Sequence, residues 1–210
     1  MITNEEIMKF MEEHPDVIPN EIPRAMLLEA ANSGKWADEK YKERVVKAIM
    51  NAEITPTLYI LCGPAGCGKT TWADKFTNEY DVRYVSRDAI RYSLLEEDDN
   101  YFAHEKETFR KFSTTIAQTL VDGFSVIADA THLNEISRYK LTRAIDQYTK
   151  NYYIIYVVFE VPENVSIERN NQRDGYARVP EKVVKQMYNN FQEPTLSEDY
   201  RAIGIMRVGA

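Results

Sequence analysis

A glycine-rich run at residues 63–70 has the residue types needed to bind phosphate groups. It fits the pattern G-x-x-x-x-G-K-[ST] in full, with an apolar segment before it and a helical pattern after it. Glycines allow several backbone N–H groups to point into one concavity, Lys69 can reach the β- and γ-phosphates of a nucleotide, and the Thr70 hydroxyl can ligate Mg²⁺. The predicted nucleotide-binding residues are Gly63, Ala65, Gly66, Cys67, Gly68, Lys69, Thr70 and Thr71.

A second group of reactive side chains surrounds Asp88. This aspartate follows a predicted strand at residues 82–86 and begins a helix, a position on the ligand side of a parallel sheet. In kinases an aspartate accepts the proton of the attacking hydroxyl, and we expect this role for Asp88. A helix N-cap is the structural alternative. The flanking Arg87 and Arg91 favour the functional interpretation, because capping does not explain two arginines there.

Asp129 ends another apolar strand, at residues 124–129. This place in the pattern predicts an acid that holds Thr70 and the metal shell. Ala130 follows it, where a second acid would have favoured activation of water and hydrolysis of the nucleotide. The pattern therefore favours transfer of a phosphoryl group to a hydroxyl. His132 lies three residues after Asp129, and we assign it no catalytic role.

Three arginines, Arg169, Arg173 and Arg178, lie close together in the last quarter of the chain. Arg169 and Arg173 are four residues apart and share one face of a helix. Arginine can bind two phosphate oxygens at once and can neutralise the charge that builds in a transition state. We predict a lid at about residues 168–180 that carries these side chains over the nucleotide and excludes water. Simple surface solubility is the alternative.

Strand and helix patterns alternate from residue 57 onward, which predicts an α/β fold with a parallel sheet covered on both faces. The glycine-rich run falls between the first strand and the first helix, and both aspartates fall at strand ends. The predicted strands are residues 57–62, 82–86, 124–129, 152–161 and 202–208, and the predicted helices are residues 69–80, 88–95, 102–121, 135–149, 163–172 and 180–191.

The composition is that of an ordinary globular protein, and a formal net charge of -7 argues against blanket electrostatic binding to nucleic acid. A local basic site is still compatible with that charge. Cys62 precedes the glycine-rich run and Cys67 lies within it, and we expect both to be reduced thiols. No apolar run approaches the ~20 residues that span a bilayer, and the N-terminus does not have the pattern of a signal peptide. We expect a soluble, cytoplasmic protein with no membrane partner.

Residues 1–53 differ from the rest of the chain and are predicted to form a helical N-terminal extension before a kinase domain at residues 54–210. Thr3 and Glu6 have the spacing of a capping box, and an apolar helical pattern follows them. The simplest interpretation is that these helices pack on the main domain. The sequence identifies no partner for them.

Four segments together resemble the polynucleotide 5′-hydroxyl kinase family, namely its phage-type enzymes and the kinase modules of bacterial RNA-repair proteins. The segments are residues 63–73, 86–91, 128–131 and 168–173, within a resemblance that covers residues 58–197. It implies a P-loop NTPase fold with a five-stranded parallel sheet, flanking helices and a lid. It also implies ATP and Mg²⁺ as cofactors and the 5′-hydroxyl end of a nucleic acid as acceptor.

The same resemblance implies a role for each matching residue. Asp88 would be the general base on the 5′-hydroxyl, and Arg91 would contact the neighbouring phosphate of the acceptor. Asp129 and Thr131 would lie beside the acceptor. The implied catalytic residues are Lys69, Asp88 and Arg173; Arg169 and Arg173 would contact the ATP phosphates; Thr70 and Asp129 would hold the metal.

Two other functions are compatible with the sequence. One is a kinase of the same fold that acts on a small-molecule, protein or modified-base hydroxyl, which the acidic net charge mildly favours. The other is an ATP-binding switch or assembly module with slow hydrolysis. A switch would turn over ATP without phosphorylating an acceptor.

Overall fold

The computed structural model describes residue 9 and residues 55–209, so the predicted extension at residues 1–53 lies almost wholly outside the described part. From residue 57 onward strands and helices alternate, and the predicted α/β fold is confirmed. The strands are β1 (Thr57–Cys62), β2 (Arg83–Ser86), β3 (Val126–Asp129), β4 (Tyr153–Glu160) and β5 (Ala202–Gly209). The helices are α4 (Lys69–Glu79), α5 (Arg87–Tyr92), α6 (Glu105–Val121), α7 (Glu135–Ile145), α8 (Glu163–Asn171), the 3-10 turn η1 (Gly175–Ala177) and α9 (Glu181–Asn189).

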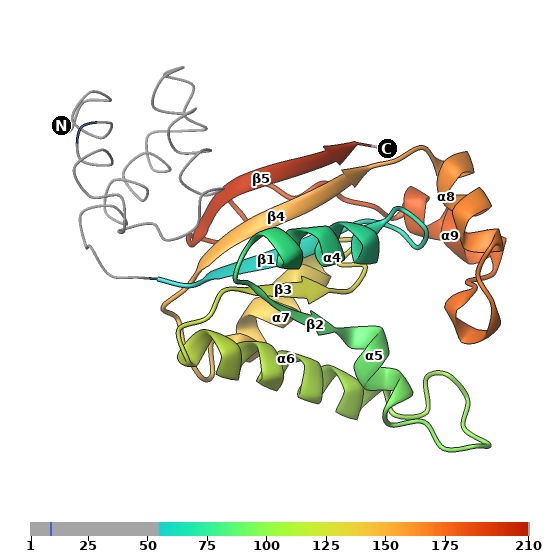
Figure 1. Ribbon diagram of the computed structural model, residues 1–210, viewed down its shortest axis with the longest axis horizontal. Coiled ribbons are helices and arrows are strands. Elements are labelled where there is room, and N and C mark those ends of the chain that lie inside the picture. The colour runs from blue at the N-terminus through green and yellow to red at the C-terminus, as the bar shows by residue number, and fades with distance from the viewer. Residues whose placement is uncertain (1–8, 10–54, 210) are drawn as a thin grey trace.

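All five strands are parallel and lie in the order β2-β3-β1-β4-β5. Their arrowheads point the same way in Figure 1, so their carboxyl ends form one edge of the sheet. The central strand, β1, pairs with β3 on one side and with β4 on the other. Because the chain order changes direction around β1, this edge is where the fold places a ligand crevice.

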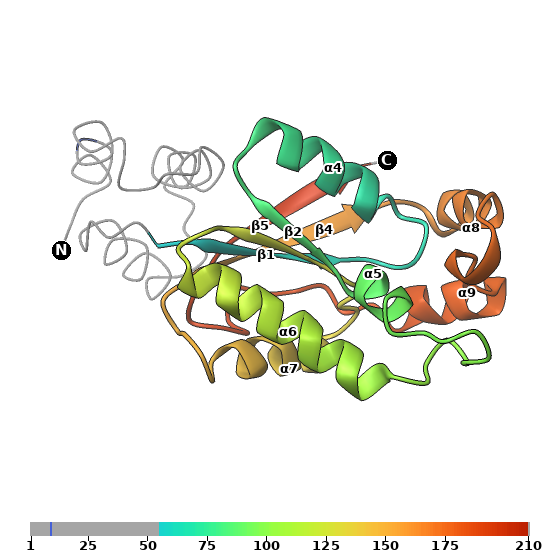
Figure 2. The same cartoon turned by 60° about the horizontal axis from the view of Figure 1, so that its bottom comes forward.

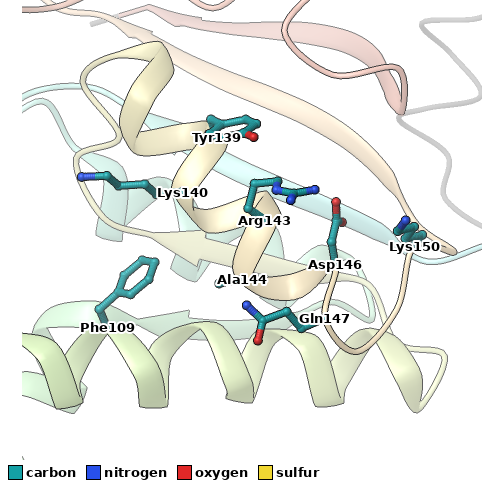
Figure 3. A pocket seen from close by; sticks show the side chains of 8 residues that line it. All are labelled: Phe109, Tyr139, Lys140, Arg143, Ala144, Asp146, Gln147 and Lys150. Atoms are coloured by element: carbon teal, nitrogen blue, oxygen red, sulfur yellow. The ribbon is translucent and has the colours of Figure 1, made fainter.

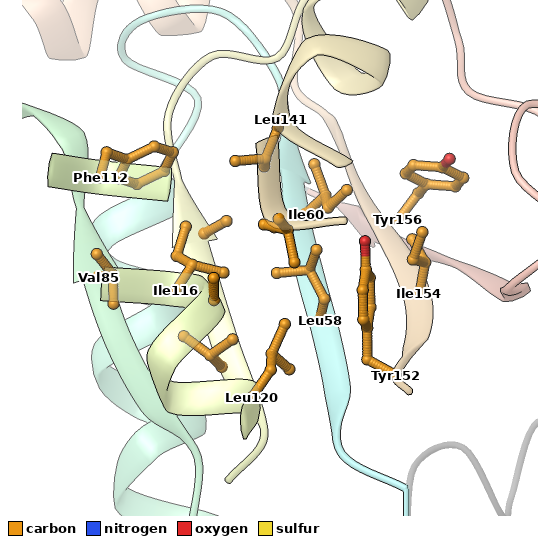
Figure 4. Packing of buried hydrophobic residues seen from close by; sticks show 14 of the residues in the cluster. Leu58, Ile60, Val85, Phe112, Ile116, Leu120, Leu141, Tyr152, Ile154 and Tyr156 are labelled. Atoms are coloured by element: carbon orange, nitrogen blue, oxygen red, sulfur yellow. The ribbon is translucent and has the colours of Figure 1, made fainter. Parts of the chain in front are cut away.

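Helices cover both faces of the sheet, with α4 on one face and α6 and α7 on the other (Figures 1 and 2). Successive side chains of β1 point to opposite faces, as the pleat of a strand requires. Leu58 and Ile60 pack with Phe112 and Leu141 in the core under α6 and α7, part of which is drawn in Figure 4. Tyr59 and Leu61 belong to a second core under α4. Two cores on one strand explain why β1 is buried along its whole length.

Helices α8 and α9 lie together beyond the carboxyl ends of the strands (Figure 1). The Tyr188 hydroxyl of α9 donates a hydrogen bond of 2.8 Å to the Val161 carbonyl, which directly follows β4. The same hydroxyl lies 2.6 Å from the Ser166 hydroxyl of α8. These contacts fix the helix pair at the edge where the glycine-rich loop emerges. Along residues 55–209, none of the helices is both long enough and apolar enough to cross a bilayer.

Candidate functional site

The glycine-rich loop joins the end of β1 at Cys62 to the start of α4 at Lys69. Gly66 and Gly68 have φ values of 83° and 98°, a region in which side chains other than glycine are strained. No side chain caps α4, and its first turn contains no acidic residue. The first-turn N–H groups and the positive end of the helix dipole therefore face the loop, an arrangement that fits an anion such as a phosphate.

Gly66 is also required by close packing between the loop and α8. A Cβ atom at Gly66 would lie 2.2 Å from the Ser166 carbonyl oxygen and 3.3 Å from the Asn170 Cβ. Real Cβ atoms do not approach a backbone oxygen so closely, so any side chain here would push α8 away from the loop. The loop and the arginine-bearing helix α8 are thus directly in contact.

Lys69 places its charge at the mouth of the loop. Its Nζ donates hydrogen bonds of 3.0 Å to the Gly63 carbonyl and 2.6 Å to the Pro64 carbonyl. Gly63 is held in turn by the segment that follows β3, because its N–H donates to the Thr131 carbonyl at 3.0 Å. Thr131, predicted to bind substrate, therefore contacts the loop through its backbone.

Asp129 lies beside the first turn of α4, where the sequence pattern predicted an acid. Its Oδ2 accepts a hydrogen bond of 2.6 Å from the Tyr84 hydroxyl and a longer one of 3.4 Å from the Thr70 hydroxyl. Burial raises the pKa of Asp129, while the Lys69 charge and the Tyr84 hydrogen bond oppose that rise. Burial and the nearby Asp129 carboxylate raise the pKa of Tyr84, so its hydroxyl stays protonated and donates.

The Thr70 hydroxyl and the Asp129 carboxylate together fit a magnesium ion. Both offer oxygen ligands, which Mg²⁺ prefers, and the two groups are within hydrogen-bond distance. Residues 55–209 contain no cluster of three or more histidine, cysteine or acidic side chains that would hold a metal by themselves. This small donor set matches Mg²⁺ sites, which rely on one or two protein ligands together with phosphate and water.

Asp88 lies in the first turn of α5 and is held by two side chains. Arg91 forms an ion pair with its Oδ1, and the Tyr101 hydroxyl donates to the same oxygen at 2.9 Å. The Asp88 side chain is 64% exposed, in contrast to the buried Asp129. Asp88 does not cap the helix: the cap is Ser86, whose hydroxyl accepts from the Ala89 N–H. The capping explanation for Asp88 is therefore wrong, and its carboxylate is directed by Arg91 and Tyr101 instead.

Arg91 is buried beneath this acid and directed toward protein groups. Its guanidinium donates four hydrogen bonds, one each to Asp88 and Tyr101 and two to the Glu105 carboxylate. Arg87 pairs with the other oxygen of Glu105. In this structure the Arg91 side chain orients Asp88 and Tyr101, and the contact to an acceptor phosphate that the resemblance implied stays a prediction.

His132 is a structural residue at the turn that follows β3. Its Nδ1 donates to the Leu61 carbonyl at 3.0 Å, and its ring stacks on Phe112. Burial lowers the pKa of His132 to about 3, so the ring is neutral near pH 7. It also adopts a φ of 38°, the one positive value recorded for a non-glycine residue among residues 55–209.

The predicted lid begins in α8 and continues through η1. Among the described residues, the guanidinium groups of Arg169, Arg173 and Arg178 have no hydrogen-bond or ion-pair partner. Arg169 Nη1 lies 3.8 Å from the position that a Cβ atom would take at Gly68, so it adjoins the phosphate loop. The base of the segment is closed by Asn170, whose side chain donates to the Val179 carbonyl and accepts from the Val179 N–H.

Three contributors to this site were not predicted from the sequence. Tyr84 reaches Asp129 only because β2 pairs with β3, and strand order is not readable from periodicity. Glu105 lies 14 residues from Arg91, with no local spacing that joins them. Tyr101 sits in a loop, where the hydrophobic pattern gives no signal.

A pocket of about 470 Å³ lies elsewhere, between α6 and α7 (Figure 3). It is lined mainly by polar and basic side chains, including Lys140, Arg143 and Lys150, together with Phe109 and Tyr139. None of the predicted site residues lines it. The candidate site is therefore defined by the phosphate loop and its neighbours, at a different place on the fold.

Comparison with known proteins supports the fold around this site. A family model described as "AAA domain" (AAA_33) matches residues 58–194. A chain of the Pnkp1/Rnl/Hen1 RNA repair complex is similar over 65% of this chain and 44% of its own length, with 24% identity and a TM-score of 0.55. A fungal RNA kinase is similar over 73% and 38% of the two chains, with 18% identity and a TM-score of 0.53. A sugar kinase from Janibacter sp. is similar over 74% and 85%, with 15% identity and a TM-score of 0.52.

Proposed function

This chain belongs to the AAA domain family, and from that premise we propose that it is an ATP-dependent kinase that phosphorylates the 5′-hydroxyl end of a nucleic acid. It spans 44% of the RNA repair protein and 38% of the fungal RNA kinase that it resembles, so further activities of those longer chains are not carried over.

The observation that carries the proposal is the contrast between two nearby aspartates. Asp129 is buried and bonded to Thr70 and Tyr84, while Asp88 is exposed and oriented by Arg91 and Tyr101. Asp88 is close enough to Asp129 to help raise its pKa. Two carboxylates in different environments can take different tasks, one at the metal and one at the hydroxyl.

The chain's own groups support an in-line transfer. Asp88 accepts the proton of the acceptor hydroxyl as that oxygen forms a bond to the γ-phosphorus of ATP. The bond from the γ-phosphorus to the β–γ bridging oxygen breaks, and ADP leaves with the electron pair. Lys69 and the loop N–H groups stabilise the negative charge on the phosphates, and Arg173 does so from the lid. Mg²⁺ held by Thr70 and Asp129 would supply further charge neutralisation on the phosphate oxygens.

The choice of acceptor rests on two considerations. Two of the similar folds belong to proteins named for RNA repair and RNA kinase activity. An enzyme that holds only the end of a strand needs few cations, so a net charge of -7 is compatible with this acceptor. The sugar kinase of similar fold represents the main alternative, a small-molecule hydroxyl.

The test is transfer of γ-labelled phosphate from ATP to a 5′-hydroxyl oligonucleotide in the presence of Mg²⁺. A 5′-phosphorylated oligonucleotide and a lane without acceptor serve as controls. We expect label on the 5′-hydroxyl strand alone. Free phosphate without labelled strand would favour an ATP-binding switch, and no release of either would favour a kinase for a different hydroxyl.

A variant of the proposed base adds a second readout to the same assay. Asp88→Asn keeps the size of the side chain but cannot accept the proton, so kcat should fall by about 10²-fold or more. ATP binding should remain, because Asp88 lies outside the phosphate loop. Loss of ATP binding in this variant would show that Asp88 supports the structure rather than the chemistry.

A further inference from the structure

A cluster of exposed aromatic rings lies beside Asp88. Tyr101 is its centre, with Tyr92 at 5.9 Å, Phe102 at 4.8 Å and Tyr176 at 5.7 Å between ring centroids. The Tyr176 ring comes from η1 in the predicted lid, and it stacks on Tyr101 at an interplanar angle of 28°. The cluster therefore joins two segments that are far apart in the sequence.

The outer rings of this cluster are exposed to solvent and do not serve to fill the protein core. Tyr92 is 41% exposed, Tyr176 58% and Phe102 63%. Neither of the two core clusters includes any of these rings. Contiguous exposed apolar side chains of this kind mark binding surfaces in soluble proteins.

The position of the cluster indicates what binds there. The Tyr101 hydroxyl donates to Asp88 Oδ1, so the cluster directly contacts the proposed general base through this hydrogen bond. The Arg91 guanidinium lies 4.6 Å from the Tyr101 ring centroid and is paired with Glu105. Its positive charge is therefore neutralised at close range, and the surface that faces solvent is made of ring faces and edges.

On the side of the loop after α5, the charge beside the rings disfavours a phosphate chain as their occupant, whereas the unpaired Arg173 and Arg178 flank Tyr176 on the lid side. Glu96, Glu97 and Asp98 are exposed in the loop between α5 and Tyr101 and would repel a nucleic acid backbone. The face of a nucleobase is uncharged and planar, and it stacks on aromatic side chains whatever its sequence.

We propose that the ring cluster of Tyr92, Tyr101, Phe102 and Tyr176 is a stacking platform for the terminal bases of a single-stranded acceptor. This inference rests on the proposed function. It identifies the aromatic cluster as the feature by which the kinase site selects a single-stranded nucleic acid. The acceptor is held through its bases while its 5′-hydroxyl lies at Asp88. Acceptor binding then requires a base, has little sequence preference and depends weakly on salt.

The experiment measures kcat and KM for a 5′-hydroxyl oligonucleotide and for a matched oligonucleotide whose terminal bases are replaced by hydrogen. For the wild-type chain, KM should rise about 10-fold when the bases are removed, as expected from loss of stacking. Tyr176→Leu and Phe102→Leu should raise KM for the intact strand by a similar factor, and the effect should fall on KM rather than kcat. Both side chains are exposed, so both variants should fold.

Tyr148→Leu is the matched control. Tyr148 is 56% exposed, close to Tyr176, and it precedes β4 at the opposite edge of the sheet. Its substitution should leave KM for the acceptor at the wild-type value. An unchanged KM in Tyr176→Leu and Phe102→Leu, or equal use of the base-free strand by the wild-type chain, would overturn the platform while leaving the kinase intact. Absence of any labelled strand with the wild-type chain would overturn the proposed function itself.

Discussion

The arginines on the two sides of the candidate site differ in whether they form ion pairs. On the phosphate side, Arg169, Arg173 and Arg178 have no ion-pair partner among residues 55–209. On the acceptor side, Arg87 and Arg91 share the Glu105 carboxylate, and Arg91 also pairs with Asp88. An unpaired guanidinium keeps its charge and its donors for an incoming phosphate, while a paired one is neutralised and held in place. We therefore predict that the unpaired arginines of this site bind phosphate, while the paired arginines orient neighbouring side chains.

The largest effect should come from the cation inside the phosphate loop. Lys69→Ala removes the charge that now rests on the Gly63 and Pro64 carbonyls, and phosphoryl transfer should fall below detection because the β- and γ-phosphates lose their partner. The measurement is label transfer from γ-labelled ATP. Lys75→Ala, an exposed lysine of the same helix, is the control and should behave like the wild type. Normal turnover by Lys69→Ala would refute the phosphate-loop assignment.

The unpaired arginines should act on chemistry. Arg173→Ala should lower kcat by about 10³-fold if this side chain neutralises charge in the transition state. The control is Arg110→Ala, because Arg110 is an exposed arginine of α6 with a partner at 3.7 Å in Glu107. Single-turnover rates distinguish chemistry from ATP binding. If kcat were unchanged in Arg173→Ala, the contrast between the two sides would not extend to catalysis.

The paired arginines should act on stability. Arg91→Ala removes two hydrogen bonds to one Glu105 oxygen and leaves only Arg87 on that carboxylate, so the free energy of unfolding should fall by about 2 kcal/mol, with the partial exposure of Glu105 taken into account. Arg169→Ala removes no ion pair and should change the free energy of unfolding by less than about 0.5 kcal/mol. Urea titration of both variants gives the comparison. Equal losses would mean that ion pairing does not distinguish the two arginines in their contribution to stability.

A smaller effect, on the pH dependence of stability, concerns the buried neutral ring of His132. Its folded-state pKa of about 3 lies below its ordinary value of 6.5, so the unfolded chain binds the proton more tightly. Stability from this group is present above pH 6.5 and is lost as pH falls toward the folded pKa. Between about pH 7 and about pH 5.5 the wild-type chain should lose about 1 kcal/mol more than His132→Asn.

The comparison variant for His132 suits the backbone at that position. Asparagine tolerates a positive φ better than most residues, and the φ of His132 is 38°. The measurement is the unfolding free energy of both proteins at the two pH values. An identical pH dependence would show that the His132 ring is not held in its neutral form by the fold.

Much of the fold was accessible from the sequence because it depends on local patterns. The apolar run of β1 and the pattern from Gly63 to Thr70 are local signals, and the predicted strand at residues 57–62 agrees with the observed β1. Proximity of Asp129 to Thr70 followed from a general property of parallel sheets, namely that strand ends meet at one edge.

The remaining features depend on long-range pairing, which no local pattern records. The Tyr84 contact with Asp129 required the β2–β3 pairing, and the Glu105 pairing of Arg91 required α6 to lie beside α5. The stack of Tyr101 on Tyr176 joins residues 75 positions apart. Periodicity describes how one element meets the core, whereas these contacts depend on which elements become neighbours.

The Asn170 side chain has a consequence for changing this protein by design. Its two hydrogen bonds to Val179 close residues 171–178 into a loop. This loop can be lengthened without moving Asn170 or Val179, the two residues at its base. Because the free-energy cost of closing a loop grows only slowly with its length, insertions between Arg173 and Tyr176 should leave the fold intact while they shift Tyr176 relative to Tyr101. Gly66, fixed against α8, permits no such freedom. Changes intended to alter acceptor preference are therefore best introduced in the loop at residues 171–178, while the phosphate loop is left unchanged.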